Sequence, residues 1–150
     1  MDQRGARFTL ETLSHRPALV TFAFGHCETV CPVVVQEARA ARLELGERIP
    51  IVVLTLDPWR DTPGRLESIL HQFQLDPTLD YVVGGSVDSV QAALDGWGIQ
   101  RQRNTRTGDI VHPTLTYLVE EDGTVAFASS GARAEVAGLG ERLGWGNHRP

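Results

Sequence analysis

The chain has 150 residues, of which 41% are hydrophobic and 22% charged, a composition typical of one soluble globular domain, expected here to span residues 1–150. A formal net charge of −5 argues against nucleic-acid binding. Apolar runs stay short of the roughly 18 residues that a membrane helix needs, and the polar start MDQRGARFTL is not typical of a signal peptide, so this chain is expected not to insert into a membrane.

The first part of the sequence predicts two buried strands separated by a helix. Residues 18–24 (ALVTFAF) and 49–56 (IPIVVLTL) are apolar runs rich in β-branched side chains, which are typical of buried strands. Residues 32–46 predict a helix that ends at Gly46, with Thr29 as a candidate N-cap. The apolar face of this helix is expected to contain Val34, Val35, Ala38 and Leu43.

The second part continues the alternation and ends with a hairpin and a helix. The turn-rich loop 57–63 is followed by a predicted helix at 63–74, a strand at 80–85 and a helix at 86–98 that Ser86 caps. The polar stretch 99–109 is expected to be irregular. The last predicted elements are a hairpin formed by 114–120 and 124–130 around an Asp-Gly turn, and a helix at 132–144.

Alternating strands and helices predict an α/β protein with helices on the faces of its sheet. The only two cysteines of the chain lie between the first strand and the first helix, in the segment HCETVCP at 26–32. This position narrows the prediction to a thioredoxin-like fold, in which a central mixed sheet is flanked by helices.

The spacing of Cys27 and Cys31 indicates that the two thiols act together. Cys31 falls near the amino end of a predicted helix, whose partial positive charge favours the thiolate. Glu28 works in the opposite direction, because a nearby carboxylate favours the neutral thiol. The pair admits thiol–disulfide exchange, with both cysteines as catalytic residues, or ligation of a soft metal such as Cu(I) or Zn(II). Zinc sites usually have four ligands, so copper with a third ligand suits the pair better.

A histidine is the natural third ligand, and His112 is the strongest candidate among five. It precedes a predicted strand, in the loop that faces the cysteine turn in a thioredoxin-like fold; the alternative is an ordinary loop histidine. Pro113 follows it, where such folds place a cis-proline. The side chain of His26, which adjoins Cys27, could point away from both sulfurs. The other histidines are His15, His71 and His148.

Three segments resemble the Sco/SenC family. FAFGHCETVCP is similar to the family's F-G-x-T-x-C-x-x-x-C-P stretch, LTLDPWRDTP to its D-P-x-R-D-T-P segment, and DIVHPTLTYLVEEDGTV to its D-H-x-x-x-x-Y-L-x-x-x-D-G segment. The three matches occur in the family's order and span residues 18 to 128.

The resemblance implies a thioredoxin fold that binds one copper ion, as Cu(I) or Cu(II), through Cys27, Cys31 and His112. It also implies a metallochaperone that helps to assemble a respiratory cytochrome c oxidase. The partner would be the copper-site subunit of the oxidase or another copper chaperone. The implied location is the periplasmic face of the bacterial cytoplasmic membrane, with the anchor absent from this chain.

The sequence departs from the family pattern beside the expected ligands. Glu28 follows the first cysteine where the family commonly has proline, and Val111 precedes the histidine where the family commonly has aspartate, a candidate partner for the imidazole. An alternative therefore stays open: a thiol–disulfide oxidoreductase that keeps the cysteines of a partner reduced, which needs Cys27 and Cys31 but not His112.

Polar residues outside this set have simpler interpretations. Asp57 and Asp61 are expected to be turn and capping residues, with Asp61 or Thr62 at the start of the helix near Pro63; a role beside the cysteines is the alternative. The loop arginines are expected to be solvated, with a docking patch for an acidic partner as the weaker possibility. These are Arg101, Arg103 and Arg106.

Overall fold

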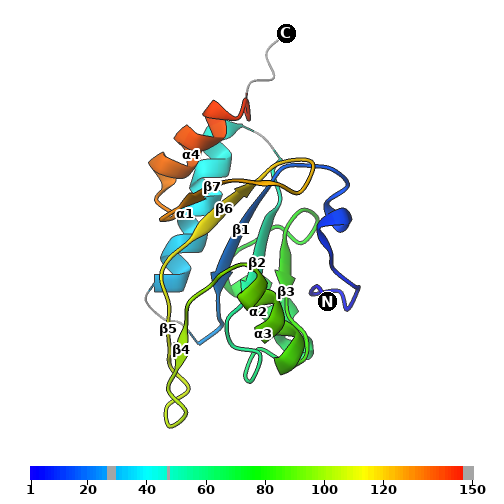
Figure 1. Ribbon diagram of the computed structural model, residues 1–150. Helices are drawn as coiled ribbons and strands as arrows, with labels where there is room; N and C mark the ends of the chain where they lie inside the picture. Colours follow the sequence, from blue (N-terminus) through cyan, green and yellow to red (C-terminus); the bar gives the residue numbers. More distant parts are fainter. Residues whose placement is uncertain (27–29, 47, 147–150) are drawn as a thin grey trace.

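A five-stranded mixed sheet forms the centre of the molecule in a computed structural model that describes residues 1–26, 30–46 and 48–146 (Figure 1). The strand order is β3-β2-β1-β6-β7. Parallel pairing joins β1 to β2 and β2 to β3, whereas β6 is antiparallel to β1 and β7 is antiparallel to β6. The strands are β1 (Ala18–Ala23), β2 (Ile51–Thr55), β3 (Tyr81–Val83), β6 (Thr116–Val119) and β7 (Val125–Ser129). The predicted mixed sheet is confirmed.

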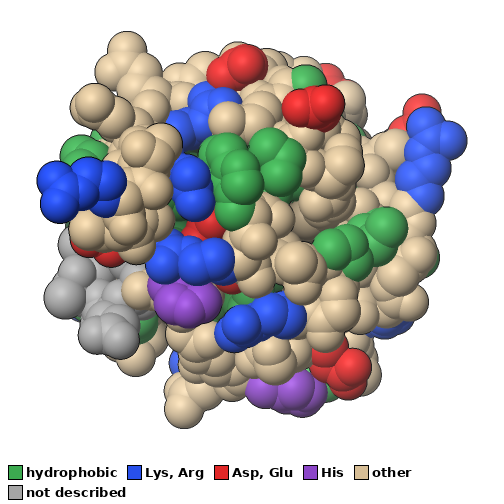
Figure 2. Space-filling model, turned by 90° about the horizontal axis from the view of Figure 1, so that it is seen from below, with side chains coloured by type: hydrophobic (Ala, Val, Ile, Leu, Met, Phe, Trp, Pro, Cys, Tyr) green, Lys and Arg blue, Asp and Glu red, His purple; other side chains and the backbone are tan. Residues whose placement is uncertain are grey.

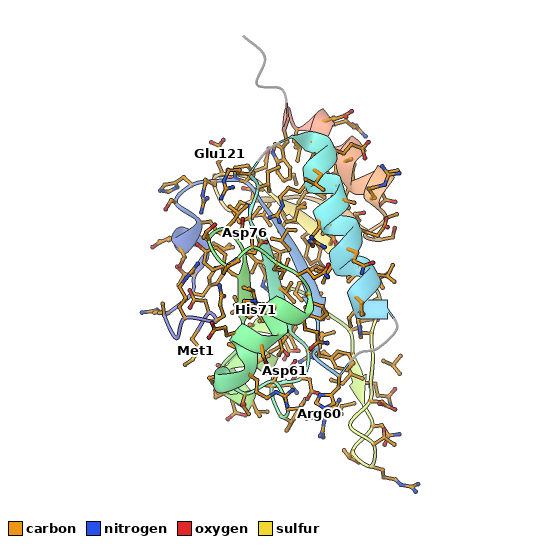
Figure 3. All side chains as sticks on the ribbon, turned by 180° about the vertical axis from the view of Figure 1, so that it is seen from behind. Met1, Arg60, Asp61, His71, Asp76 and Glu121 are labelled. Atoms are coloured by element: carbon orange, nitrogen blue, oxygen red, sulfur yellow. The ribbon has the colours of Figure 1, made fainter. Side chains whose placement is uncertain are left out.

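Helices cover both faces of the sheet. Because the connections β1-α1-β2 and β2-α2-β3 step the same way across the sheet, right-handed crossovers place α1 and α2 on one face. α4 packs beside α1 on that face, and α3 covers the other (Figures 1 and 3). The helices are α1 (Val30–Leu45), α2 (Leu66–Gln72), α3 (Val87–Gly96) and α4 (Arg133–Arg142). β1 is buried along its whole length because it is covered on both faces.

The buried face of α1 differs from the prediction at one position. Val34, Val35 and Ala38 are buried as expected, but Leu43 is 80% exposed. Positions 34, 38, 41 and 45 follow the helical repeat, so the stripe continues through Ala41 and Leu45, both buried, and leaves Leu43 on the far side. α1 ends at the predicted place, where Gly46 adopts a left-handed φ of 70°.

Most of the other predicted elements are present with shifted ends. Ser86 caps α3 by accepting a hydrogen bond from the Ser89 N–H at 3.1 Å. The β6–β7 hairpin turns at Gly123, whose φ is 87°. The helix predicted at 63–74 consists of a 3-10 turn, Pro63–Arg65, followed by α2, which ends at Gln72. A further 3-10 turn, Leu10–Leu13, precedes β1.

The stretch 99–109 is more ordered than predicted. Its short strand β4 (Gln102–Arg103) pairs antiparallel with β5 (Ile110–Val111) in a two-stranded ribbon that projects from one end of the sheet (Figure 1). Strands of two residues are too short to show an alternating pattern of apolar and polar side chains, so the sequence gives no sign of them.

Candidate metal centre

Three loops meet at one end of the sheet. The carboxyl ends of the parallel strands β1 and β2 lie at this end, and so does the start of β6, because Thr21 near the end of β1 pairs with Thr116 at the start of β6. The Thr21 hydroxyl also donates a hydrogen bond to the Leu115 carbonyl at 2.8 Å, which fixes the loop before β6 against β1. The topology therefore brings the cysteine segment after β1 next to the His112 loop before β6.

Cys31 and His112 are neighbours at this junction. Cys31 lies in the first turn of α1 and is completely buried, and its Sγ is 3.7 Å from His112 Nε2. The two residues are 81 positions apart in the sequence, so only the fold brings them together. The structure thus places together two of the three side chains that the sequence singles out. The third, Cys27, and its neighbour Glu28 lie outside the described residues, as does the candidate N-cap Thr29.

The imidazole of His112 has a defined orientation. Its Nδ1 lies 2.9 Å from the carbonyl oxygen of Pro113. A carbonyl can only accept, so Nδ1 carries a proton in this contact, and in the neutral imidazole the lone pair is then on Nε2, the nitrogen beside Cys31. The ring packs in a T-shaped arrangement against Phe24, a buried residue directly after β1, with ring centroids 5.9 Å apart. This arrangement prepares Nε2 to act as a ligand.

Two expectations about the His112 loop need correction or refinement. The His112–Pro113 peptide bond is trans, so the predicted cis-proline is wrong. The carbonyl oxygen of Pro113 accepts a hydrogen bond from the imidazole. In the family pattern, the aspartate before the histidine is the candidate for this contact. Val111, which occupies that position here, is 74% exposed.

Asp57 is a turn residue as predicted, since its Oδ1 accepts a hydrogen bond from the Arg60 backbone N–H at 3.3 Å, but neither Asp57 nor Asp61 caps the helix that follows. Thr62 occupies the N-cap position of the 3-10 turn, and within the described residues its side chain makes no capping hydrogen bond. The Asp61 carboxylate points back to the strand ends, where its Oδ2 accepts hydrogen bonds from the Gly25 N–H at 3.0 Å and the Thr55 hydroxyl at 2.7 Å. Burial of this carboxyl raises its pKa, with a further contribution from the negative charge of Asp57. The capping prediction for Asp61 is wrong, and its alternative role beside the cysteine segment fits the structure.

Arginine side chains gather over this end of the molecule, interspersed with apolar ones (Figure 2). Arg60 pairs with the buried Asp57 and donates a hydrogen bond to the Gly108 carbonyl at 2.7 Å, which ties the β4–β5 ribbon to the β2 loop. Arg103 stacks over Trp59, with its guanidinium carbon 4.3 Å from the ring centroid. Arg101 is held by Asp95 at 2.8 Å, and Arg106 is exposed. Of the three loop arginines, only Arg106 is a simply solvated residue.

Among the other described histidines, His26 alone belongs to a group of three possible metal ligands. His71 is an exposed residue of α2 whose Nε2 is 4.0 Å from Glu67, and His15 is an exposed residue between the 3-10 turn Leu10–Leu13 and β1. His148 lies outside the described residues. His26 is exposed and lies close to Asp57 and Asp61. Sequence analysis did not group these three residues, although the meeting of the carboxyl ends of β1 and β2 was available as a signal.

The sheet order, the cysteine in the first turn of α1 and the loop that faces it define a thioredoxin-like protein with a thiol–imidazole site. Comparison with known proteins agrees with this class. The SCO1/SenC family model matches residues 1–137, and the chain belongs to this family. The helices of the described residues are all too short or too polar to cross a membrane.

Individual relatives and structures show the same similarity. A candidate copper-binding protein of Stutzerimonas stutzeri is 33% identical in an alignment of 134 positions that covers 83% of this chain and 63% of that protein. The chain thus spans less than two thirds of the length of that relative. The structure of Bradyrhizobium japonicum ScoI with copper bound is 25% identical, with a TM-score of 0.78, and covers 95% of this chain and 94% of its own. Arabidopsis thaliana ScoI with copper bound, at 17% identity and a TM-score of 0.84, covers 95% of this chain and 93% of its own and shares the fold.

Proposed function

We propose that the chain binds one copper ion through the thiolates of Cys27 and Cys31 and through Nε2 of His112, and that it delivers this copper during assembly of a respiratory cytochrome c oxidase. The observation that carries the proposal is the 3.7 Å separation between Cys31 Sγ and His112 Nε2. Bonds of about 2.3 Å to sulfur and about 2.0 Å to nitrogen, the lengths found at zinc, place two ligands of a trigonal centre roughly 3.7 Å apart.

The donor set suits copper in both oxidation states. Thiolates are soft ligands that select Cu(I), and an imidazole is a good ligand for Cu(II) as well. The contacts of the His112 ring with Pro113 and Phe24, together with the 3.7 Å separation of its Nε2 from Cys31 Sγ, support its role as a ligand. Membership of the SCO1/SenC family and the similarity to a copper-bound ScoI structure support copper as the cargo.

The proposed partner is the copper-site subunit of the oxidase or another copper chaperone, and the proposed location is the periplasmic face of the bacterial cytoplasmic membrane. Both follow from the family. Transfer to a partner requires that at least one ligand can be reached from outside. Cys31 is completely buried, whereas His112 is partly exposed, so we expect ligand exchange to begin on the His112 side.

An anaerobic titration of the reduced protein with Cu(I), against a competing chelator, tests the proposal. We expect one copper per chain. Loss of a residue that only hydrogen-bonds to a metal ligand typically weakens metal binding by about 10- to 100-fold, so we expect His112→Ala, which removes a ligand itself, to weaken binding by at least about tenfold. His71→Ala is the matched control, because His71 is an exposed histidine of α2, and it should bind as the wild type does.

Failure to retain copper against the chelator would overturn the proposal. The best remaining account would then be thiol–disulfide exchange by Cys27 and Cys31, which the position of Cys31 in the first turn of α1 supports. That activity would be largely insensitive to His112→Ala, so a thiol-exchange assay on the same variant separates the two functions.

A further inference from the structure

We propose a second metal site, for a divalent first-row cation, formed by His26, Asp57 and Asp61. One ligand atom from each of these residues lies within 4.8 Å of the other two. His26 follows β1 and the two aspartates follow β2, so the site is built where the carboxyl ends of neighbouring parallel strands meet. It uses none of the proposed copper ligands and does not rest on the proposed function.

The two carboxylates of this site are both buried, and only one of them has an arginine as counter-charge among the described residues. Asp57 and Asp61 are both completely buried. Asp57 has a counter-charge, because Arg60 pairs with it and its Oδ1 accepts a hydrogen bond from the Arg60 backbone N–H at 3.3 Å. No arginine pairs with Asp61 among the described residues. Figure 3 shows Asp61 and Arg60 at the end of the molecule below α2.

One oxygen of the Asp61 carboxylate lacks a partner among the residues that the structure describes, which suggests a ligand. Its Oδ2 is satisfied by Gly25 and Thr55, but Oδ1 is buried and has no hydrogen-bond partner within the described part of the chain. Buried carboxylate oxygens are ordinarily paired with a hydrogen-bond donor or a cation, because an unpaired oxygen loses its hydration and gains no interaction that offsets this cost. A cation bound between Asp57, Asp61 and His26 would satisfy this oxygen.

The third ligand gives the site its access and its selectivity. His26 is exposed, so a cation can enter from solvent on the side of the imidazole and reach the buried carboxylates behind it. An imidazole with two carboxylates suits Zn(II), Co(II), Ni(II) or Cu(II), whereas Cu(I) prefers thiolates. The site is therefore chemically distinct from the Cys31–His112 pair. The guanidinium of Arg60 leaves a net charge of −1 on the cluster of the two aspartates, His26 and Arg60, which a divalent cation reverses to +1.

Cobalt(II) is the probe for this site, because its absorption reports the ligand type. In the variant Cys27→Ser/Cys31→Ser/His112→Ala, which lacks the proposed copper ligands, we expect one Co(II) per chain with weak ligand-field bands and without a sulfur-to-cobalt charge-transfer band. Adding His26→Ala should weaken this binding by at least about tenfold. Adding His71→Ala instead should leave it unchanged, since His71 is an exposed histidine beside a single carboxylate. Adding Asp61→Asn should also weaken it.

The wild-type chain provides the same test if the triple variant fails to fold, which far-UV circular dichroism would reveal. Cobalt held by thiolates is recognised by its strong charge-transfer band, so the second site appears as an additional equivalent with weak bands only. His26→Ala must remove that equivalent and keep the charge-transfer band. The proposal is overturned if a folded protein takes up no such equivalent, or if uptake is indifferent to His26→Ala or to Asp61→Asn. Neither result bears on copper binding by the cysteines.

Discussion

Two buried aspartates, Asp80 and Asp61, lie at opposite ends of the parallel strands, and they differ in how completely they are paired. Asp80 precedes β3 and is completely buried. Both of its oxygens are used: they pair with the two terminal nitrogens of Arg42 and accept hydrogen bonds from the backbone N–H groups of Ile51 and Asp76. This carboxylate joins the end of α1 to the starts of β2 and β3.

Asp61, at the other end, is equally buried but has an oxygen without a hydrogen-bond partner among the described residues. Arg60, which precedes it in the sequence, pairs with Asp57 instead. The difference separates two uses of a buried carboxylate. A fully paired buried carboxylate stabilises the fold, whereas an incompletely paired one can still bind a ligand. The incompletely paired carboxylate lies at the end of the sheet that also contains Cys31 and His112.

The largest effect that this comparison predicts is on stability, for Asp80→Ala. Removing the carboxylate leaves the Arg42 guanidinium, only 13% exposed, without its partner and removes the acceptor of two backbone N–H groups. Breaking a buried ion pair typically costs about 3–5 kcal/mol, so we expect a loss of that size in the free energy of unfolding, measured by urea denaturation.

Arg48→Ala is the control for this measurement. Arg48 is 72% exposed and lies 3.9 Å from Asp76, in the same region of the fold. An exposed pair of this kind contributes at most about 1 kcal/mol. If Asp80→Ala were as mild as Arg48→Ala, the contrast between the two buried aspartates would collapse.

A smaller effect, and one that depends on pH, is predicted for Asp61→Asn in the metal-free protein. Burial raises the pKa of Asp61 above its value in the unfolded chain, so between the two pKa values the folded state binds more protons and stability falls as pH rises. The amide oxygen of asparagine can take over both hydrogen bonds of Oδ2 without a buried charge. The free energy of unfolding of the variant should therefore increase relative to that of the wild type as pH rises from about 4, near the ordinary carboxyl pKa, toward neutrality.

Urea denaturation of both proteins in the presence of a chelator, over that pH range, gives the measurement. A wild type that instead becomes more stable relative to Asp61→Asn with rising pH would show that Asp61 is a well-paired carboxylate like Asp80, and the distinction between the two ends of the sheet would fail.

The fold could be predicted from the sequence to the extent that its elements are long and regular. β1 and β2 are continuous apolar runs, and Ser86 and Gly46 mark helix ends by local chemistry. The β4–β5 ribbon could not be found, because strands of two residues have no periodicity. Leu43 was misplaced because an apolar residue on the solvent side of a helix costs little, so its hydrophobicity alone does not assign its face.

The candidate site could be predicted only in part, for a related reason. His112 was found because a thioredoxin-like order of elements, together with the family resemblance, assigns its loop to the cysteine turn. The role of Asp61 depends on Gly25, 36 positions away, and on Thr55, so its local setting before Pro63 suggested a cap instead. Helix caps act over a few residues and are visible in a sequence, whereas contacts between loops of neighbouring strands appear only once the sheet is assembled.

The most direct test of the central claim, that Cys27, Cys31 and His112 bind one copper ion, is X-ray absorption at the copper edge on the reduced protein loaded with one equivalent of Cu(I). The account predicts sulfur scatterers in the first shell together with the multiple-scattering pattern of a single imidazole, and His112→Ala should remove only the imidazole pattern. A spectrum without sulfur, or an imidazole pattern that persists in His112→Ala, would contradict the claim.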